Sequence, residues 1–162
     1  HQLGIEYEKI YLDIFKGEQH SGGYDAVNPN RKIPVLVDGG FNMWESNAIL
    51  LYLGKKYSPN PLYPDDLPAF GRMAQWLLYG KTSIDPNLAV ARFMTKFLPP
   101  ESVDEKRLNE LRAQGGAVLR VLDSHLEHYD FLAGEYSMAD IACFPYVSLA
   151  PEGGIDLSPY PS

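Results

Sequence analysis

A carboxylate beside a helix start is the feature of this sequence that most clearly suggests chemistry. Glu45 and Ser46 precede an apolar helical run, and serine is a common residue at the N-cap of a helix. The free N–H groups of such a helix start bind anions, and Glu45 could pair with an ammonium group. A ligand that carries both groups, such as the amino-acid end of a peptide, would match this pair.

Ile33 and Pro34 lie shortly upstream, at the entrance to the apolar run over residues 35–37. A proline in a cis bond is tolerated at the mouth of a strand and shapes the site there. An Asp-Gly-Gly turn signal at residues 38–40 then predicts a hairpin that ends at Trp44. A helix cap with an acid beside it occurs in many proteins, so it is the neighbouring hairpin that favours a ligand site.

The segments around this pair predict a small α/β domain over residues 1–57. Residues 1–4 resemble the last turn of a helix that ends at Gly4, and residues 5–13 alternate as a strand does. A polar loop and a short helical segment lead to a turn at Asn28-Pro29-Asn30. The hairpin and a helix over residues 46–57 complete the domain.

The rest of the chain predicts an all-helical domain over residues 67–162, after a proline-rich linker at 58–66. Asp85-Pro86 should break or bend the first helix of this domain before it resumes toward Phe97. A second long helix carries an apolar stripe over residues 108–126, and its Gly115-Gly116 pair indicates close packing or a bend.

The last clear helix opens at Ser137, which forms a capping box with Asp140. Charged residues are scarce from 141 to 150, so this helix should lie in the centre of the helical domain. Cys143 on it is expected to be a buried, inert thiol. His125 and His128 have a spacing that could ligate a metal, but no third ligand is evident, so an ordinary surface helix is the favoured interpretation.

Composition narrows the possible partners. The formal net charge of −7 argues against nucleic acid and anionic membranes as partners. The single cysteine excludes an internal disulfide and suits a reducing, cytoplasmic compartment. No signal peptide and no membrane-spanning apolar run is visible. The chain starts at His1 and ends without an obvious final element, so we expect it to be a piece of a longer protein.

Four motifs, in this order and spacing, resemble the cytosolic glutathione S-transferase family, with closest similarity to its bacterial, theta-like and phi-like branches. They are Asn28-Pro-Asn-Arg-Lys-Ile-Pro-Val-Leu, Trp44-Glu-Ser-Asn-Ala-Ile, Leu62-Tyr-Pro and Phe131-Leu-Ala-Gly-Glu-Tyr-Ser-Met-Ala-Asp-Ile-Ala. The resemblance implies a thioredoxin-like N-terminal domain that binds glutathione and a helical C-terminal domain that supplies the second-substrate pocket. It also implies a homodimer, and glutathione as co-substrate with no further cofactor.

The resemblance assigns the glutathione site residue by residue. Ile33, before the cis Pro34, would pair its backbone with the cysteinyl part of glutathione, as an added strand does. Glu45 would bind the ammonium of the γ-glutamyl end. Ser46, with the helix start, would bind the carboxylate of that end.

The glycyl end of glutathione is assigned to a second group of residues. Lys32, and with it Arg31, would lie near the glycyl carboxylate, while Gln19 and His20 fall where related enzymes carry a His or Lys for that same carboxylate. An uncharged glutamine stands at the first of those two positions. The loop over residues 21–25 also departs from the family pattern, so we expect it to be altered or disordered.

The resemblance places the catalytic Ser, Tyr or Cys upstream of His1, so no residue of this sequence is assigned that role. The implied activity is conjugation of glutathione to small hydrophobic electrophiles by thiolate attack. Another glutathione-dependent reaction on the same fold remains open: isomerisation, dehalogenation, peroxide reduction or thiol transfer. So does a non-catalytic interaction module.

Overall fold

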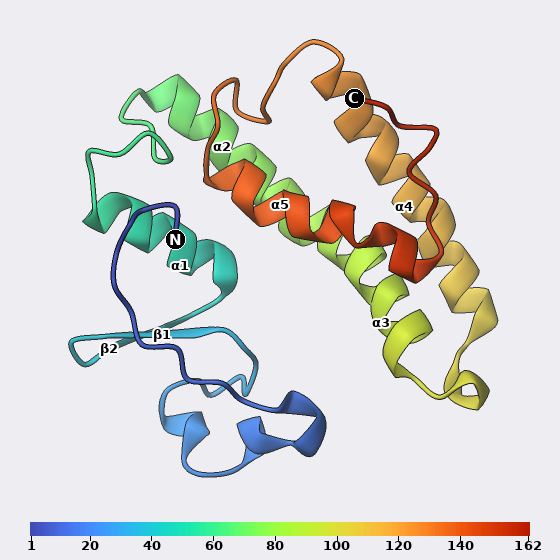
Figure 1. Cartoon of the computed structure of the whole chain (residues 1–162), viewed down its shortest axis with the longest axis horizontal. Coiled ribbons are helices and arrows are strands. Elements are labelled where there is room, and N and C mark those ends of the chain that lie inside the picture. Colours follow the sequence, from blue (N-terminus) through green and yellow to red (C-terminus); the bar gives the residue numbers. More distant parts are fainter. The chain divides into compact units, whose positions relative to one another are not determined.

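An α/β unit and an all-helical unit follow one another along the chain, in the order that the sequence predicts (Figure 1). The computed structural model describes residues 1–162, and the two units are His1–Asn60 and Pro61–Ser162. The first unit contains η1 (Ile14–Lys16), η2 (Glu18–His20), η3 (Tyr24–Ala26), β1 (Val35–Asp38), β2 (Phe41–Trp44) and α1 (Ser46–Lys56). The second contains α2 (Leu67–Tyr79), η4 (Gly80–Ala89), α3 (Val90–Phe97), η5 (Pro100–Ser102), α4 (Glu105–Leu126), α5 (Met138–Ser148) and η6 (Ala150–Gly153).

The hairpin of the first unit forms where the Asp-Gly-Gly signal predicts it. β1 and β2 are antiparallel, with Val35 opposite Trp44 and Asp38 opposite Phe41. Gly39 and Gly40 join them with φ values of 56° and 89°, which a side chain would strain. Two central residues with positive φ match the right-handed twist of the flanking strands, so the turn fixes the register. Helix α1 packs against both strands.

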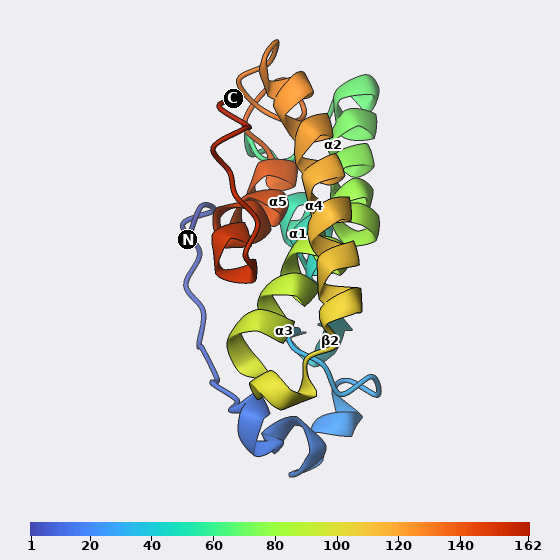
Figure 2. The ribbon, with the colours of Figure 1, turned by 90° about the vertical axis from the view of Figure 1, so that its right-hand side faces the viewer.

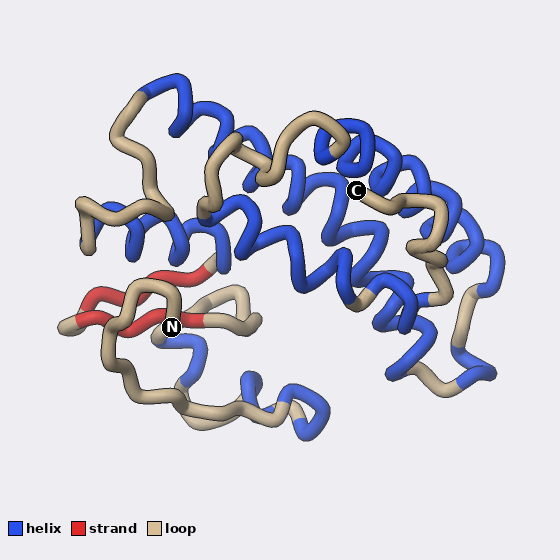
Figure 3. Tube along the Cα trace, turned by 45° about the horizontal axis from the view of Figure 1, so that its top comes forward, coloured by secondary structure: helices blue, strands red, loops and turns tan.

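The strand predicted over residues 5–13 does not form, and Figure 3 shows this segment as loop. A strand exists only by hydrogen bonding to a partner, and β1 and β2 pair only with each other. Ile10 and Tyr11 are accordingly 78% and 80% exposed. The predicted helix end at residues 1–4 is a single turn, in which the N–H of Gly4 donates to the carbonyl of His1 at 2.9 Å.

Helices α2 and α3 are joined by η4, at the place where Asp85-Pro86 predicts a break or a bend. The helix does not break there. The ten residues of η4 form a π-helical stretch, and Pro86 lies inside it. The wider turn tolerates a residue without an N–H, and side chains take up carbonyls of the same region. Asn87 Nδ2 donates to the Ser83 carbonyl at 2.7 Å, and Thr82 Oγ1 donates to that of Leu78 at 2.9 Å.

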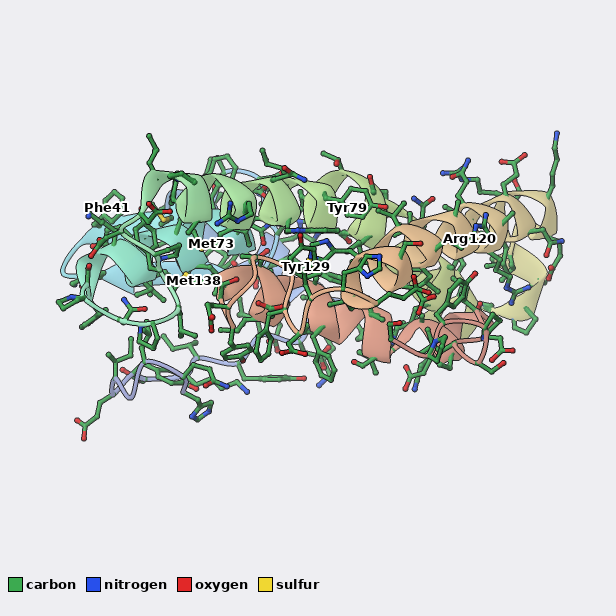
Figure 4. The ribbon with its side chains drawn as sticks, turned by 90° about the horizontal axis from the view of Figure 1, so that it is seen from above. Phe41, Met73, Tyr79, Arg120, Tyr129 and Met138 are labelled. Atoms are coloured by element: carbon green, nitrogen blue, oxygen red, sulfur yellow. The ribbon has the colours of Figure 1, made fainter.

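The hydrophobic core lies in the helical unit. Helices α2 and α5 pack together, and the fully buried Met73 and Met138 lie where they meet (Figure 4). The predicted close packing at Gly115 is confirmed. A Cβ on this residue would lie 2.8 Å from Ile155 Cδ1 and 2.8 Å from Leu88 Cδ2, so only a glycine lets these side chains approach α4.

The capping box at the start of α5 is confirmed, because Ser137 and Asp140 exchange the hydrogen bonds that define it. The central position predicted for α5 is only half right. Met138, Ala139 and Cys143 are buried, whereas Phe144 is 70% exposed. An apolar helix without charges can therefore still present one face outward.

The chain after α5 returns along α4, as Figures 1 and 2 both show. The Tyr160 hydroxyl donates to the Gly116 carbonyl at 3.0 Å, and the Ser162 N–H donates to Asp123 Oδ1 at 3.0 Å. A Cβ on Gly116 would lie 3.1 Å from the Tyr160 hydroxyl oxygen, so both glycines of α4 serve packing. None of the helices is long and apolar enough to cross a membrane.

Candidate glutathione site

The hairpin register brings the two predicted halves of the site to one end of the sheet. The two residues before Val35 are Ile33 and Pro34, and the two after its partner Trp44 are Glu45 and Ser46. Because the strands are antiparallel, both pairs leave the hairpin at the same end. Ten residues lie between these pairs in the sequence, and the hairpin brings the pairs together in space.

The start of α1 corrects the prediction for Ser46. The N-cap position is occupied by Glu45, and Ser46 is the first helical residue. The first hydrogen bond of the helix runs from the Ile49 N–H to the Glu45 carbonyl at 3.0 Å, and Glu45 makes no side-chain cap. The N–H of Ser46 therefore precedes the intrahelical ladder and points out of the helix start, where an anion can accept from it.

Glu45 is held in a conformation that non-glycine residues rarely adopt. Its φ is 72° and its ψ is 111°. Backbone strain of this kind costs about 1–3 kcal/mol and clusters at functional sites. The carboxylate is exposed beside the helix start and is available to a cationic group.

Ile33 carries the unpaired backbone of the site. Its peptide bond to Pro34 is cis, and neither its N–H nor its C=O bonds to another backbone group in the chain. The side chain is 51% exposed. Pro34 has no N–H, so Ile33 alone offers a donor and an acceptor just before β1. An extended peptide could pair with them as an additional strand.

The two predicted cations lie next to Ile33 and have different surroundings. Arg31 adopts a left-handed φ of 52°, and its guanidinium pairs with Asp25 at 3.5 Å. Because Asp25 partly compensates the positive charge of Arg31, its attraction for a second carboxylate is weaker. Lys32 has an exposed side chain, and its carbonyl is held from within the unit.

Gln19 and His20 lie in η2, away in sequence from the hairpin ends. Gln19 is half-buried, and its Oε1 is buried without a hydrogen-bond partner, while His20 is exposed. This element packs against η1 and η3. The loop over residues 21–25 forms a defined turn, with Gly22 and Gly23 in the left-handed region at φ values of 66° and 77°.

Two residues that sequence reasoning did not assign organise the segment before Ile33. Asn28 is 1% exposed, and its side chain bonds to Lys32 and Asn30. The Tyr24 hydroxyl donates to the Lys32 carbonyl. The turn signal at Asn28-Pro29-Asn30 marked the place, but nothing in the sequence indicates that the amide of Asn28 is buried.

The far end of β1 carries an ion pair instead of a ligand site. Lys56 and the Tyr52 hydroxyl both bond to Asp38 Oδ2. The hydrogen bond from Lys56 is the largest cause that holds the pKa of the Asp38 carboxyl below its usual value. These contacts fasten α1 to the turn end of the hairpin.

The remaining candidate residues belong to the helical unit and are structural. Cys143 is 2% exposed, and burial raises the pKa of its thiol to about 12, which confirms the expected inert thiol. His125 stacks on Tyr129 with ring centroids 4.7 Å apart, and its Nε2 lies 3.0 Å from the Leu132 carbonyl. No group of three or more potential ligand side chains is arranged to hold a metal ion.

Comparison with known proteins agrees with this geometry. Residues 1–55 match the family model of the glutathione S-transferase N-terminal domain. Glutathione S-transferase F10 of Arabidopsis thaliana is 36% identical over 150 residues, which cover 90% of this chain and 70% of the relative.

Solved structures support the same relationship. A glutathione S-transferase from Pseudomonas fluorescens superimposes with a TM-score of 0.90 at 37% identity, over 98% of this chain and 79% of its own. A glutathione transferase from Burkholderia graminis, solved with two glutathione molecules per subunit, has a TM-score of 0.87 at 29% identity, over 98% and 70% of the two chains. The expected thioredoxin-like fold with a helical C-terminal region is confirmed, and this chain belongs to the glutathione S-transferase family.

Proposed function

We propose that this protein is a glutathione transferase that conjugates reduced glutathione to small hydrophobic electrophiles. One observation carries the proposal: the hairpin brings the unpaired backbone of Ile33 to the same end as Glu45 and the open start of α1. That end offers complementary groups for a peptide with a free amino-acid end. The relative from Burkholderia graminis binds glutathione, which is such a peptide.

In the proposed complex the γ-glutamyl end lies at the start of α1. Its carboxylate accepts from the Ser46 N–H and hydroxyl, and its ammonium pairs with Glu45. The cysteinyl residue extends along Ile33 and Pro34. Lys32 faces the glycyl carboxylate, with Arg31 nearby.

Gln19 and His20 complete the proposed site at the glycyl end. The amide nitrogen of Gln19 is the group that donates toward the ligand in this proposal, and the buried amide oxygen has no hydrogen-bond partner in the chain. A neutral donor contributes less than a lysine to binding a carboxylate, because it lacks the attraction between two opposite charges. Most of the ionic attraction at this end then comes from Lys32.

The chemistry proposed is attack by the glutathione thiolate. The thiol loses its proton, the sulfur forms a bond to an electrophilic carbon, and the electron pair of the broken bond leaves with the departing group or is taken up by the acceptor. The residue that lowers the thiol pKa is expected before His1.

We propose the following organisation for this chain. Residues 1–57 form the glutathione-binding domain, 58–66 the linker and 67–162 the helical domain that takes the electrophile. The protein is a homodimer and acts in the cytoplasm, where its one thiol, buried in the helical unit, stays reduced.

Retention on immobilised glutathione tests the proposal. The double variant Glu45→Ala/Ser46→Ala should lose retention, whereas the control Ser124→Ala/Glu127→Ala, at exposed positions of the helical unit, should be retained like the unchanged protein. Equal retention of both variants would contradict the assignment of the site. Failure of the unchanged protein to bind would contradict the proposed function.

A further inference from the structure

Two side chains converge on a single carbonyl next to the ligand-binding backbone. The Tyr24 hydroxyl donates to the Lys32 carbonyl oxygen at 2.9 Å, and Asn28 Nδ2 donates to the same oxygen at 2.6 Å. The orientation of the Asn28 amide is fixed, because its Oδ1 accepts from the Asn30 N–H at 2.9 Å. Both lone pairs of the Lys32 carbonyl therefore have a donor.

The carbonyl of Lys32 and the N–H of Ile33 belong to one peptide unit. That peptide is trans, because the only cis bonds in the chain precede Pro34 and Pro59. In a planar trans peptide the C=O and the N–H point in opposite directions. Fixing the carbonyl of Lys32 toward Tyr24 and Asn28 consequently turns the N–H of Ile33 outward, where it has no partner in the chain.

The surroundings of Tyr24 keep it a donor. Its ring is half-buried, and burial raises the pKa of its phenol above the usual value, so the hydroxyl stays protonated at neutral pH. Segment 24–28 also bonds to Arg31, the residue before Lys32. Asp25 forms an ion pair with the Arg31 guanidinium, and the Asn28 carbonyl accepts from the Arg31 N–H at 3.0 Å. Hydrogen bonds and an ion pair from segment 24–28 thus fix residues 31 and 32.

From this geometry we infer that Tyr24 is a positioning residue for glutathione: its hydroxyl, with Asn28, fixes the Lys32–Ile33 peptide so that the Ile33 N–H faces the cysteinyl carbonyl of the ligand. The inference rests on the proposed function and adds a residue that does not touch the ligand. Two donors on the carbonyl also polarise the peptide, which makes the Ile33 N–H a stronger donor.

The two anchors of Lys32 have separable roles. Asn28 also organises its own turn through Asn30, so its loss would disturb the loop itself. The Tyr24 hydroxyl makes only the bond to the Lys32 carbonyl and a contact with Asn28. Removing that one oxygen is therefore the cleaner test of whether the orientation of the peptide matters to the ligand.

Calorimetric titration with S-methylglutathione tests the inference on the unchanged protein, Tyr24→Phe and Tyr52→Phe. Tyr52 is the matched control, because its hydroxyl bonds to Asp38 at the other end of β1. Tyr24→Phe should raise the Kd by about three- to tenfold, the worth of one hydrogen bond. Tyr52→Phe should leave it unchanged.

A second readout separates positioning from general damage. In Tyr24→Phe the NMR signal of the Lys32 carbonyl carbon should shift, while the signals of α1 and the thermal midpoint stay as in the unchanged protein. Equal Kd values for the unchanged protein and Tyr24→Phe would overturn the inference and leave the proposed function standing. Absence of binding by the unchanged protein would instead overturn the proposed function.

Discussion

Different kinds of interaction stabilise the interior of each of the two units. Every buried hydrophobic residue lies in the helical unit, from Leu62 to Ile155. In the α/β unit the fully buried residues are Asn28 and Gly54, and the apolar side chains of the hairpin and α1 are half-buried at most. The helical unit therefore depends on packing, whereas the order of the candidate site depends on hydrogen bonds between side chains and backbone.

This difference separates stability from ligand binding. A change to packing in the helical unit should lower the free energy of unfolding and leave the affinity of the folded protein for glutathione unchanged. A change to the polar contacts of residues 24–34 should weaken the affinity for glutathione and leave the free energy of unfolding of the helical unit unchanged. Four substitutions test that separation, beginning with the largest expected effect.

Leu111→Ala should cause the largest loss of stability. Leu111 is fully buried on α4, and removing such a side chain costs about 2–5 kcal/mol through lost burial and the cavity that remains. Urea unfolding followed by far-UV circular dichroism measures the loss. The Kd of the folded variant for S-methylglutathione should equal that of the unchanged protein, and a weaker affinity would show that the two properties are coupled.

Gly153→Ala should destabilise the helical unit by about 1–3 kcal/mol, as overpacking does. A Cβ there would lie 2.8 Å from the backbone nitrogen of Arg92, and a backbone atom cannot rotate away. Gly71→Ala is the control, because a Cβ at that helical position of α2 meets nothing within 4 Å. It should stabilise the protein by about 0.5–1 kcal/mol, and equal effects of both substitutions would contradict this view of the packing.

Asn28→Asp should weaken binding of S-methylglutathione by about tenfold, because a carboxylate cannot donate to the Lys32 carbonyl. The acceptor for the Asn30 N–H is kept, so the turn itself should persist. Calorimetry measures the affinity, and circular dichroism the unfolding of the helices. Loss of helical stability without loss of affinity would reverse the roles of the two units.

Glu152→Gln should have the smallest effect, and that effect should depend on pH. Hydrogen bonds from Lys96 and Arg92 hold the pKa of the Glu152 carboxyl below its usual value. A lowered pKa in the folded state means that the contribution is present at neutral pH and is lost as the pH falls through the lowered pKa of this carboxyl. The variant should be slightly less stable than the unchanged protein at pH 7, and the difference should shrink as acid protonates Glu152. A constant difference would contradict the ion pair.

Much of the fold could be predicted where the signal is local. The Asp-Gly-Gly sequence indicates its own turn, Ser137 and Asp140 form a capping box within one helical turn, and the paired glycines of α4 indicate close packing. These features depend on a few neighbouring residues, so the sequence contains nearly all the information that determines them.

The failures concern features that depend on distant partners. Residues 5–13 have the composition of a strand, but a strand needs a second one to bond with. The sequence predicts a break or a bend at Pro86, but it does not indicate the π-helical stretch that accommodates this proline. Sequence patterns indicate which residues prefer a strand or a helix, but they do not indicate what will pair with them.

The candidate site shows the same division. Ile33-Pro34 and Glu45-Ser46 could be found from motifs, and the hairpin register that joins them follows from the turn. The positive φ of Glu45 and the convergence of Tyr24 and Asn28 on one carbonyl could not be found, because both arise from how the chain folds back on itself. The assignment of all the site residues to glutathione stays a prediction.

Titration of ¹⁵N-labelled protein with S-methylglutathione, followed by NMR, tests the central claim most directly. We expect the amide signals of Ile33 and Ser46 to shift together and saturate at one common Kd, while the amides of α4 stay in place. Binding that leaves Ile33 and Ser46 unchanged would contradict the assignment of glutathione to this end of the hairpin.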